Sequence, residues 1–445
     1  MTKSTMGPSS TAVPNSTGIT VIVVGLGLAG LTAAIECHRK GHRVIGMEKS
    51  PNISAVGDVF SIGTNGTAVI RRWDDGFIYK LLTDNRCEID QISVWNDAGE
   101  LKETKSPDGY GPGEGFVISR ADTVRTFYEY ARRIGIEMHF GMRVTEYFED
   151  GCRAGIIANG QVFWADCIVA SDGIHSKARS LISGGDCEPQ KTGSAIYRSG
   201  YPAKHLEGVQ GAQWLLEEAG VKDQLNHFIG KDITILVATG RKGKDVYWGC
   251  MHKSFHDTSE PWLQESDVDN ALHHIKHWPI YDRLAPIIQK TPKGKCFDHL
   301  VLSASPLSRW VSANGRMILV GDAAHPLLPT TGQGANQAIE DGATLAICLE
   351  LAGKERIPDG LRAMEKLRSR RVAIIQEYGL ELMTALHEAD WEAVEQHKKP
   401  TMIVRPDWIF SHDCQQFTYQ EFDRAMDSPC GGPVYIPTNI PTNVV

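Results

Sequence analysis

The sequence predicts an α/β protein with two interleaved domains, one built on a parallel sheet and one on an antiparallel sheet, followed by C-terminal helices. Three observations carry this prediction. The chain has 445 residues, which is too many for one compact core. From residue 19, a strand, a glycine-rich turn, a helix and a second strand follow one another. Three strand-like segments with glycine-containing turns lie between residues 226 and 252.

The first βαβ unit follows from local patterns. Residues 19–24 form a continuous apolar run that ends at a glycine, which is typical of a buried parallel strand. Residues 28–40 have helical spacing of apolar side chains, and Gly41 is a C-terminal stop signal. Residues 43–47 are predicted to form the second strand.

Later elements extend both domains. The spacing predicts a helix over residues 122–134 and a hairpin arm that runs into a core strand over residues 161–170. Residues 226–252 are predicted to form three antiparallel strands that serve as the wall of a substrate cavity. A short buried strand at 317–320 and a long helix at 334–352 complete the pattern.

The predicted division of the chain is discontinuous. We expect a disordered tail over residues 1–18; a parallel-sheet domain over 19–75, 99–182 and 296–400; an antiparallel-sheet domain over 76–98 and 183–295; and an extension over 401–445.

Composition excludes several classes of protein. The net charge is -8, from 46 basic and 54 acidic residues, and no long basic run points to a nucleic-acid partner. The ten cysteines are scattered without a CxxC pair, so neither a disulfide framework nor a metal site is expected. The N-terminus lacks the features of a signal peptide, and no apolar stretch is long enough to span a bilayer. These features predict a cytoplasmic protein with no transmembrane segment.

The first chemical motif is the turn between the first predicted strand and helix. It contains Gly25, Gly27 and Gly30, where the backbone can approach a pyrophosphate at a helix N-terminus. Glu48 ends the second strand, where a carboxylate can accept hydrogen bonds from a ribose diol. This motif predicts a dinucleotide cofactor but does not distinguish FAD from NAD.

The second motif, GDAAHP at residues 321–326, follows a predicted strand. The Asp322 carboxylate can bind a ribityl hydroxyl, and the helix after the motif can direct its N-terminus at the pyrimidine side of a flavin. That helix begins with Gly334, Ala335 and Asn336.

The third motif, ASDGIHSKAR at residues 170–179, contains Asp172. Together the three motifs resemble those of the group A flavoprotein monooxygenases, the family of p-hydroxybenzoate and salicylate hydroxylases. The resemblance spans residues 19 to about 400, with Ala170-Ser171 in place of the usual Gly-Ala.

This resemblance implies a Rossmann-like FAD-binding domain of the p-hydroxybenzoate hydroxylase type, with the antiparallel β-sheet domain binding substrate. It implies FAD as cofactor and O2 as co-substrate. NADPH or NADH serves as a transient reductant, because only one GxGxxG-type motif is present. By the same resemblance, Asp172 contacts the pyrophosphate, Arg120 contacts the FAD, and the backbone of Val144 meets the adenine.

A departure from the family pattern points to the substrate. Asp58 lies in the loop that would run beside the isoalloxazine, where a carboxylate next to a reduced flavin is costly unless it is paired. Arg198 is its natural partner. Such a pair resembles the fungal indole-alkaloid monooxygenases, including those that form spiro-oxindoles in paraherquamide- and notoamide-type pathways. The implied reaction is 2,3-epoxidation of an indole alkaloid and rearrangement to an oxindole, with Arg198, held by Asp58, opening the epoxide.

The same residues are compatible with different functions. Asp58 and Arg198 can equally form an ordinary interdomain ion pair, or never meet. An arginine can also anchor a carboxylate or phenolate, so a phenol or salicylate-type hydroxylase is a competing hypothesis. A flavoprotein-like fold that binds cargo without catalysis is a third hypothesis, and a flavin oxidase or dehydrogenase is a fourth.

Overall fold

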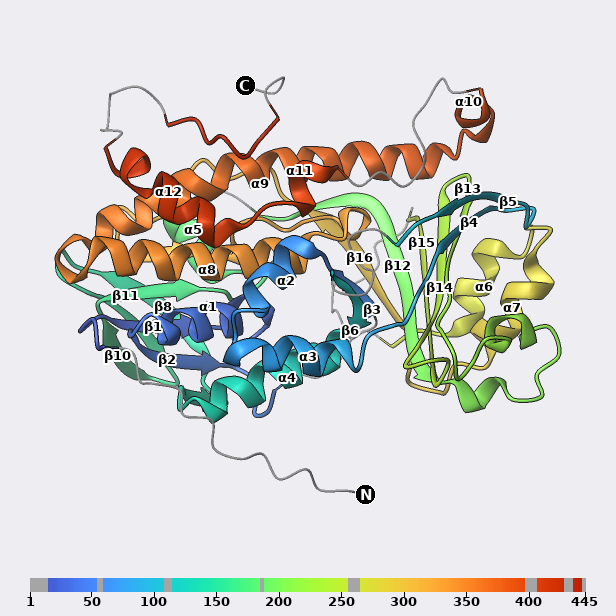
Figure 1. The fold of residues 1–445 in the computed structure, drawn as a ribbon, viewed down its shortest axis with the longest axis horizontal. Coiled ribbons are helices and arrows are strands. Elements are labelled where there is room, and N and C mark those ends of the chain that lie inside the picture. The colour runs from blue at the N-terminus through green and yellow to red at the C-terminus, as the bar shows by residue number, and fades with distance from the viewer. Residues whose placement is uncertain are drawn as a thin grey trace.

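A five-stranded parallel sheet forms the centre of one half of the molecule, as seen on the left of Figure 1. The computed structural model describes residues 15–53, 59–107, 114–184, 188–254, 265–396, 406–427 and 435–441. The strand order is β17-β11-β1-β2-β7. The strands are β1 (Thr20–Val24), β2 (Arg43–Glu48), β7 (Glu137–Phe140), β11 (Cys167–Ala170) and β17 (Met317–Leu319).

Helices α1 (Leu28–Arg39) and α8 (Gly334–Ala352) pack against each other in this half. Their backbones approach closely because a Cβ on Gly342 would lie 2.7 Å from the Ala33 nitrogen. Nearly all of α8 is buried, since α9 (Ile357–Glu388) packs against it as well. This explains why its sequence is apolar with little amphipathic pattern.

A seven-stranded, mostly antiparallel sheet forms the other half of the molecule (Figure 1). Its order is β16-β12-β15-β14-β13-β4-β5, and only β13 and β4 pair in parallel. Its bounds are β4 (Ile92–Asn96), β5 (Leu101–Lys105), β12 (Gln190–Pro202), β13 (Leu225–Gly230), β14 (Ile233–Gly240), β15 (Asp245–Lys253) and β16 (Phe297–Ser303). Helices α6 (Val268–Ile275) and α7 (Tyr281–Gln289) cover one face.

Smaller elements complete both halves. One small sheet contains β8 (Val144–Glu149), β9 (Ala154–Ala158) and β10 (Gln161–Ala165), and another contains β3 (Val59–Ile62) and β6 (Phe116–Ser119). The remaining helices are α2 (Thr64–Ile70), α3 (Phe77–Thr83), α4 (Arg120–Arg133), α5 (Lys177–Ser183), α10 (Trp391–Glu395), α11 (Asp407–Phe410) and α12 (Cys414–Met426).

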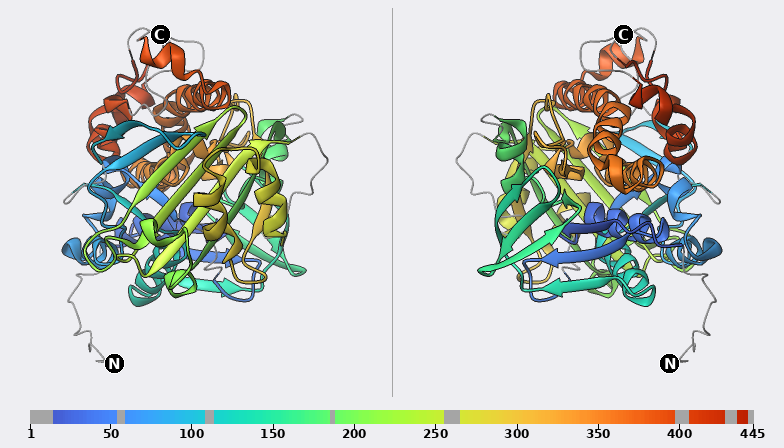
Figure 2. Two further views of the ribbon diagram at one scale, coloured as in Figure 1. Left: turned by 90° about the vertical axis from the view of Figure 1, so that its right-hand side faces the viewer. Right: turned by 90° about the vertical axis from the view of Figure 1, so that its left-hand side faces the viewer.

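Helix α9 joins the two halves. It runs along the top of both in Figure 1, and the two side views of Figure 2 place the C-terminal helices together on that same side. Leu382 and Leu386 of α9 pack on Ile229 and Met251 of the seven-stranded sheet, while the first half of α9 packs against α8. One helix thus fixes the sheet relative to the parallel-sheet half.

The predicted α/β fold class is confirmed by this architecture. The βαβ unit, the three sequential antiparallel strands and the helix at 334–352 form as expected. Two strands belong to a different sheet from the one that the expected domain bounds imply. The sequence pattern assigns residues 99–105 and 297–303 to the parallel-sheet domain, but β5 and β16 pair within the seven-stranded sheet. The sheet that a strand joins is decided by its pairing with strands distant in the chain, and local sequence does not encode that pairing. The division into domains otherwise stays a prediction.

None of the helices in the described residues is both long enough and apolar enough to cross a membrane.

Candidate functional site

The three chemical motifs meet at one edge of the parallel sheet. Each motif follows a strand: the glycine turn follows β1, the Asp172 motif follows β11, and the Asp322 motif follows β17. These strands are neighbours in the order β17-β11-β1 and run parallel. Because the carboxyl ends of parallel strands share one edge, segments almost 300 residues apart in the chain lie side by side. This edge is where ligands bind in open α/β sheets.

The glycine turn leaves room for a ligand at one position only. Cβ atoms on Gly25 and Gly30 would collide with protein, at 2.5 Å from the Ser171 carbonyl oxygen and 1.8 Å from the Gly25 carbonyl oxygen. A Cβ on Gly27 would meet no described atom within 4 Å. The first and third glycines therefore permit the fold of the turn, whereas Gly27 leaves open space where a pyrophosphate can approach.

Ser171, the departure from the family pattern, has a structural role here. Its hydroxyl lies 2.8 Å from the carbonyl oxygens of both Val24 and Gly25. It therefore holds the end of β11 against the glycine turn. A hydroxyl at this position ties the first and third motifs together.

Glu48 and Val144 lie at the end of the sheet expected to hold the adenosine. The Glu48 carboxylate accepts hydrogen bonds from the backbone nitrogens of Leu26 at 2.8 Å and Ser50 at 2.9 Å. Each oxygen retains a second lone pair that can accept from a ribose. The backbone oxygen of Glu48 accepts from the Met142 nitrogen at 2.8 Å, two residues before Val144, which begins β8.

Asp172 has one carboxylate oxygen bonded and one without a partner. Its Oδ2 accepts hydrogen bonds from the Tyr147 hydroxyl at 2.9 Å and the Lys177 backbone nitrogen at 3.1 Å. Its Oδ1 is buried and has no hydrogen-bond donor among the described residues. Burial and the neighbouring Asp172 charge raise the pKa of Tyr147 well above its ordinary value, so Tyr147 stays a donor. An orphaned acceptor at this edge suits a ligand that brings a hydroxyl.

Arg179, which ends the third motif, joins it to the second. Its guanidinium donates to the backbone oxygens of Ile174 at 2.6 Å, Asp322 at 2.5 Å and Ala323 at 2.9 Å. The side chain is almost fully buried. Sequence reasoning places Arg179 within the motif but gives it no separate role, because its position between two strand ends is visible only in the fold.

The Asp322 carboxylate lies near the predicted FAD contact Arg120. It is accessible to solvent but has protein on most sides, which raises its pKa. Electrostatic interactions with His325, Arg120 and Arg179 lower the pKa of Asp322 and oppose this effect. The structure therefore brings Arg120 of α4 and Asp322 into one electrostatic environment, although 200 residues separate them in the chain.

We expect Arg179→Lys to weaken FAD binding about tenfold, since lysine cannot make the three fixed hydrogen bonds and each bond to a charged group is worth about 1.5 kcal/mol or more. Fluorescence titration of the apoprotein with FAD measures this. Lys177→Met is the matched control, because the Lys177 side chain is exposed two residues away. Equal affinities for both variants would contradict the positioning role.

The N-terminus of α8 directs backbone donors at the same edge. The N–H groups of Gly334, Ala335 and Asn336 have no intrahelical acceptor in the first turn. The Asn336 side chain is turned inward: it accepts from the Gly63 nitrogen at 2.8 Å and donates to the oxygens of Gly332 and Ser61. The predicted contact of Asn336 with FAD can therefore be made by its backbone rather than its side chain.

A buried ionic network supports the Asp322 turn from behind. Asp341 of α8 accepts from the Gly321 nitrogen at 2.9 Å and bonds His325 at 2.6 Å. Arg368 of α9 bridges Asp341, at 2.9 Å, and Glu340. Burial would raise the pKa of Glu340, but the charges of Arg368 and Arg371 hold it at about 2. Both carboxylates therefore stay ionised at neutral pH.

Arg371 carries this network on to the C-terminal segment. It contacts Glu340 at 3.4 Å and donates to three backbone oxygens, those of Trp408 at 3.0 Å, Ile409 at 2.9 Å and Asn439 at 2.9 Å. Phe410, which follows Ile409, packs against a hydrophobic cluster that contains Val117 of β6 and Leu225 of β13. The C-terminal segment thus reaches the junction between the two halves.

Arg198 lies on the seven-stranded sheet and is 2% exposed. Its Nε is 3.4 Å from Nδ1 of His299, and its guanidinium carbon is 5.8 Å from the Phe297 ring centre. Burial and the charge of Arg198 lower the pKa of His299 to about 3. The histidine is therefore neutral and accepts from Arg198. The predicted partner Asp58 lies outside the described residues. No sequence motif marks His299.

Strand register sets Arg198 in a row across the sheet. Arg198 pairs with Phe297 on one side and Gly249 on the other, and Gly249 pairs with Leu236, which pairs with His227. Residues paired directly across strands point to the same face. Trp248 and Cys250, which flank Gly249 on β15, point to the opposite face, into the hydrophobic cluster that includes residues of α6 and α7. The row therefore faces the parallel-sheet half of the molecule.

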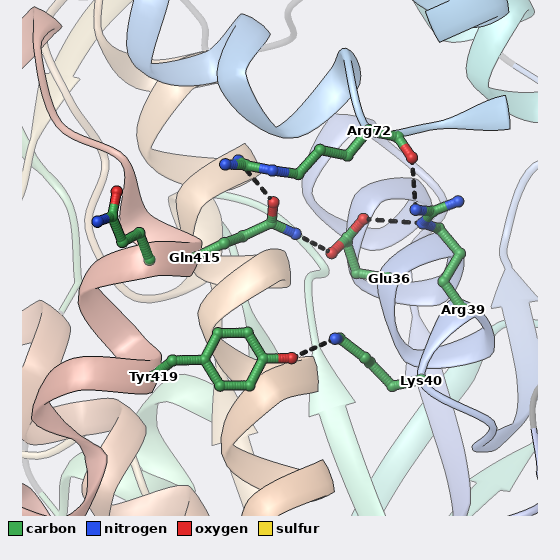
Figure 3. Close-up of a pocket in the computed structure, with 7 residues that line it drawn as sticks. Glu36, Arg39, Lys40, Arg72, Gln415 and Tyr419 are labelled. Carbon is green, nitrogen blue, oxygen red and sulfur yellow. Dashed lines mark hydrogen bonds and ion pairs between the residues drawn. The ribbon is translucent and has the colours of Figure 1, made fainter. Parts of the chain in front are cut away.

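A pocket of about 250 Å³ lies elsewhere, where α12 docks on the C-terminal end of α1. Figure 3 shows Glu36 and Gln415 bonded at its centre, with Arg72 and Arg39 beside them. Glu36 lies nine positions after Gly27 along this helix, which is roughly 14 Å. The three basic residues of the pocket have acidic partners: Arg39 with Glu36, Lys40 with Glu350 and Arg72 with Asp413. We assign this pocket to helix docking.

The residues at the sheet edge fit FAD. Open space over Gly27 suits a pyrophosphate, and the oxygen of Asp172 that lacks a donor suits a hydroxyl. The N-terminus of α8 beside Asp322 suits the flavin pyrimidine. Within the described part of the chain, no group of three or more His, Cys, Asp and Glu side chains is placed to hold a metal ion.

Comparisons with known proteins bear on the same site. Residues 110–377 match a family model described as FAD binding domain, and residues 20–67 match a second one. The notoamide E oxidase notB' of Aspergillus versicolor is 40% identical over 100% of this chain and 98% of that protein. The crystal structure of CtdE in complex with FAD and substrate 4 is 57% identical, with a TM-score of 0.89 over 92% of this chain and 98% of that one. A salicylate hydroxylase substrate complex, 22% identical with a TM-score of 0.73 over 94% and 100%, shares the fold.

Proposed function

Because this chain belongs to the FAD binding domain family and to its FAD-dependent monooxygenases, we propose that it inserts one oxygen atom of O2 into an indole alkaloid of fungal secondary metabolism. FAD is its cofactor. The finer proposal is 2,3-epoxidation of the indole and semipinacol rearrangement to an oxindole or spiro-oxindole, with NADPH or NADH as reductant. The similarity to a notoamide E oxidase supports the choice of substrate class.

The observation that carries the proposal is the buried cation Arg198 on the sheet face that is turned toward the parallel-sheet half. When bound at the sheet edge, FAD would supply hydride acceptance from the nicotinamide and activation of O2. The protein must then bind the substrate ring, exclude water and stabilise the charge that develops on the transferred oxygen. A guanidinium does not lose its proton at neutral pH. Arg198 therefore acts as a fixed hydrogen-bond donor.

The geometry around Arg198 suits opening of an epoxide. When the carbon–oxygen bond of an indole epoxide breaks, negative charge gathers on the oxygen, and a donor held beside it lowers the barrier. A neighbouring carbon substituent then migrates, and the oxygen becomes a carbonyl without a net change in protons. Neutral His299 accepts from Arg198 Nε and so orients the guanidinium, which has further N–H donors on its terminal nitrogens. In this proposal Asp58 holds Arg198 as well.

The test is NADPH oxidation in air by the FAD-loaded enzyme with a panel of indole alkaloids and simple phenols, with H2O2 measured in parallel. We expect a complex indole to stimulate NADPH oxidation and to yield a product one oxygen atom heavier with little H2O2. Stimulation by phenols or salicylates alone would replace the indole proposal with a phenol hydroxylase. Flavin reduction by the organic substrate without NADPH would identify an oxidase.

We expect Arg198→Met to lower the rate of oxygenated product about a hundredfold while FAD binding is retained, because removal of a charge-stabilising donor typically costs about that factor. The measurement is product formation against NADPH oxidation, and the fraction of NADPH lost to H2O2 should rise. Arg283→Met is the control: Arg283 stacks 4.1 Å from the Trp214 ring centre on the opposite side of the sheet. A similar loss in both variants would argue against a role in the reaction.

A further inference from the structure

Gly249 is a glycine in the interior of β15, which is an unusual place for one. The strand is otherwise filled with bulky residues, among them Tyr247, Trp248 and Met251. A glycine weakens a strand, and it often marks a place where a ligand or another backbone approaches closely. Its φ does not lie in the left-handed region, so the backbone does not require glycine here.

A side-chain methyl group at Gly249 would meet no clash among the described residues. A Cβ built on it would lie 3.7 Å from Ile196 Cδ1 and 3.8 Å from the Tyr197 carbonyl oxygen, which are ordinary contacts. The described residues therefore leave room for the methyl group of an alanine. Neither backbone conformation nor packing accounts for the glycine.

The neighbouring rows on the same face are covered by protein. On one side, Met251 and Ile229 pack under Leu382 and Leu386 of α9. On the other side, Ala238 and Leu225 pack in the cluster that includes Phe410. The row between them is the one that contains Arg198, Gly249 and Leu236. The missing side chain thus falls between two packed patches and directly beside the buried arginine.

We propose that Gly249 determines the size of the substrate: its missing side chain makes the seat for a fused aromatic ring system between Arg198 and Leu236. One end of this seat offers a hydrogen-bond-donating cation, and the other offers apolar contact with Leu236, which packs against the cluster that contains Leu225 and Ala238. A flat polycyclic aromatic with one polar edge fits both. A single-ring phenol does not need the space. This inference rests on the proposed function, since it assigns the substrate to the same site.

The test compares Gly249→Ala and Gly249→Val with the wild-type holoenzyme. Each added carbon occupies the seat, so the KM for a polycyclic indole alkaloid should rise about tenfold for alanine and up to about a hundredfold for valine. The KM for simple indole or phenol should change less than about threefold. Thermal stability should stay equal or rise slightly for Gly249→Ala, because glycine in a strand is destabilising. A purely structural role for Gly249 predicts the opposite change in stability.

Cys250→Ala is the matched control, since Cys250 lies next on the same strand but points into the cluster under α6 and α7. It should lower stability without changing the KM for the alkaloid. Unchanged KM in both Gly249 variants with FAD retained, or an equal rise for large and small substrates, would overturn the inference. If the wild type oxidises only phenols, the proposed function fails, and the Gly249 variants are then compared on phenol and on bulky substituted phenols.

Discussion

Replacement of Arg368 by methionine is expected to lower the free energy of unfolding by about 3–5 kcal/mol, because it leaves two buried carboxylates without their shared cation. Glu340 and Asp341 are fully buried, and Arg368 contacts both. Methionine has a similar length, so the loss of packing is small. Urea unfolding of the holoenzyme at pH 8 measures the effect. Arg362→Met is the control, because Arg362 is 41% exposed and pairs at 3.7 Å with Asp359; it should change stability by less than about 0.5 kcal/mol.

The same variant has a defined pH dependence. In the wild type, the pKa of Glu340 is held at about 2, below the value of about 4.3 in an unfolded chain. The ionised carboxylate therefore contributes stability above about pH 4.3, and that contribution is lost as the pH falls toward 2. Without Arg368 the pKa of both carboxyl groups rises. The stability deficit of Arg368→Met should then be smaller at pH 5 than at pH 8, and a constant deficit would show that packing is the cause.

The second large effect concerns the glycine turn. We expect Gly30→Ala to abolish FAD binding and to destabilise the apoprotein, because the new Cβ would lie 1.8 Å from a backbone oxygen and the turn must rearrange. Gly27→Ala should weaken FAD binding by about tenfold to a hundredfold through overpacking against the pyrophosphate. It should leave the stability of the apoprotein unchanged, since the added methyl group meets no described atom within 4 Å.

Two measurements separate these outcomes: the ratio of flavin to protein absorbance after purification, and thermal unfolding of the apoprotein. Gly151→Ala provides the control, because its added Cβ also meets no described atom within 4 Å and lies outside the three motifs. A Gly27→Ala protein with full flavin content would contradict the assignment of the pyrophosphate to this turn.

The elements that sequence patterns predict well are those whose signals are local. The strand–turn–helix at residues 20–39 and α8 have their determinants within a few residues, namely a buried apolar run, a glycine turn and helical spacing. The three chemical motifs belong to this class. Their position at one sheet edge then follows from the parallel order of β17, β11 and β1.

The substrate side of the site is predicted less well from sequence patterns. Arg198 is recognised by resemblance, but His299 and Gly249 have no local signal. They become neighbours of Arg198 only through the register of β12 with β16 and β15, and such a register depends on pairing between distant segments. Asn336 shows a related limit, because a sequence motif identifies the residue and not whether its backbone or its side chain is used.

The separation of the two halves along the chain has a consequence for how this enzyme can diversify. Arg198, His227, Leu236, Gly249 and His299 all lie within the contiguous stretch 190–303. Every residue assigned to FAD lies outside it. Exchange of that stretch between relatives would therefore replace five of the seven strands of the substrate sheet and leave the residues assigned to FAD and the buried ionic network unchanged. The substrate preference can then change while the cofactor site stays the same.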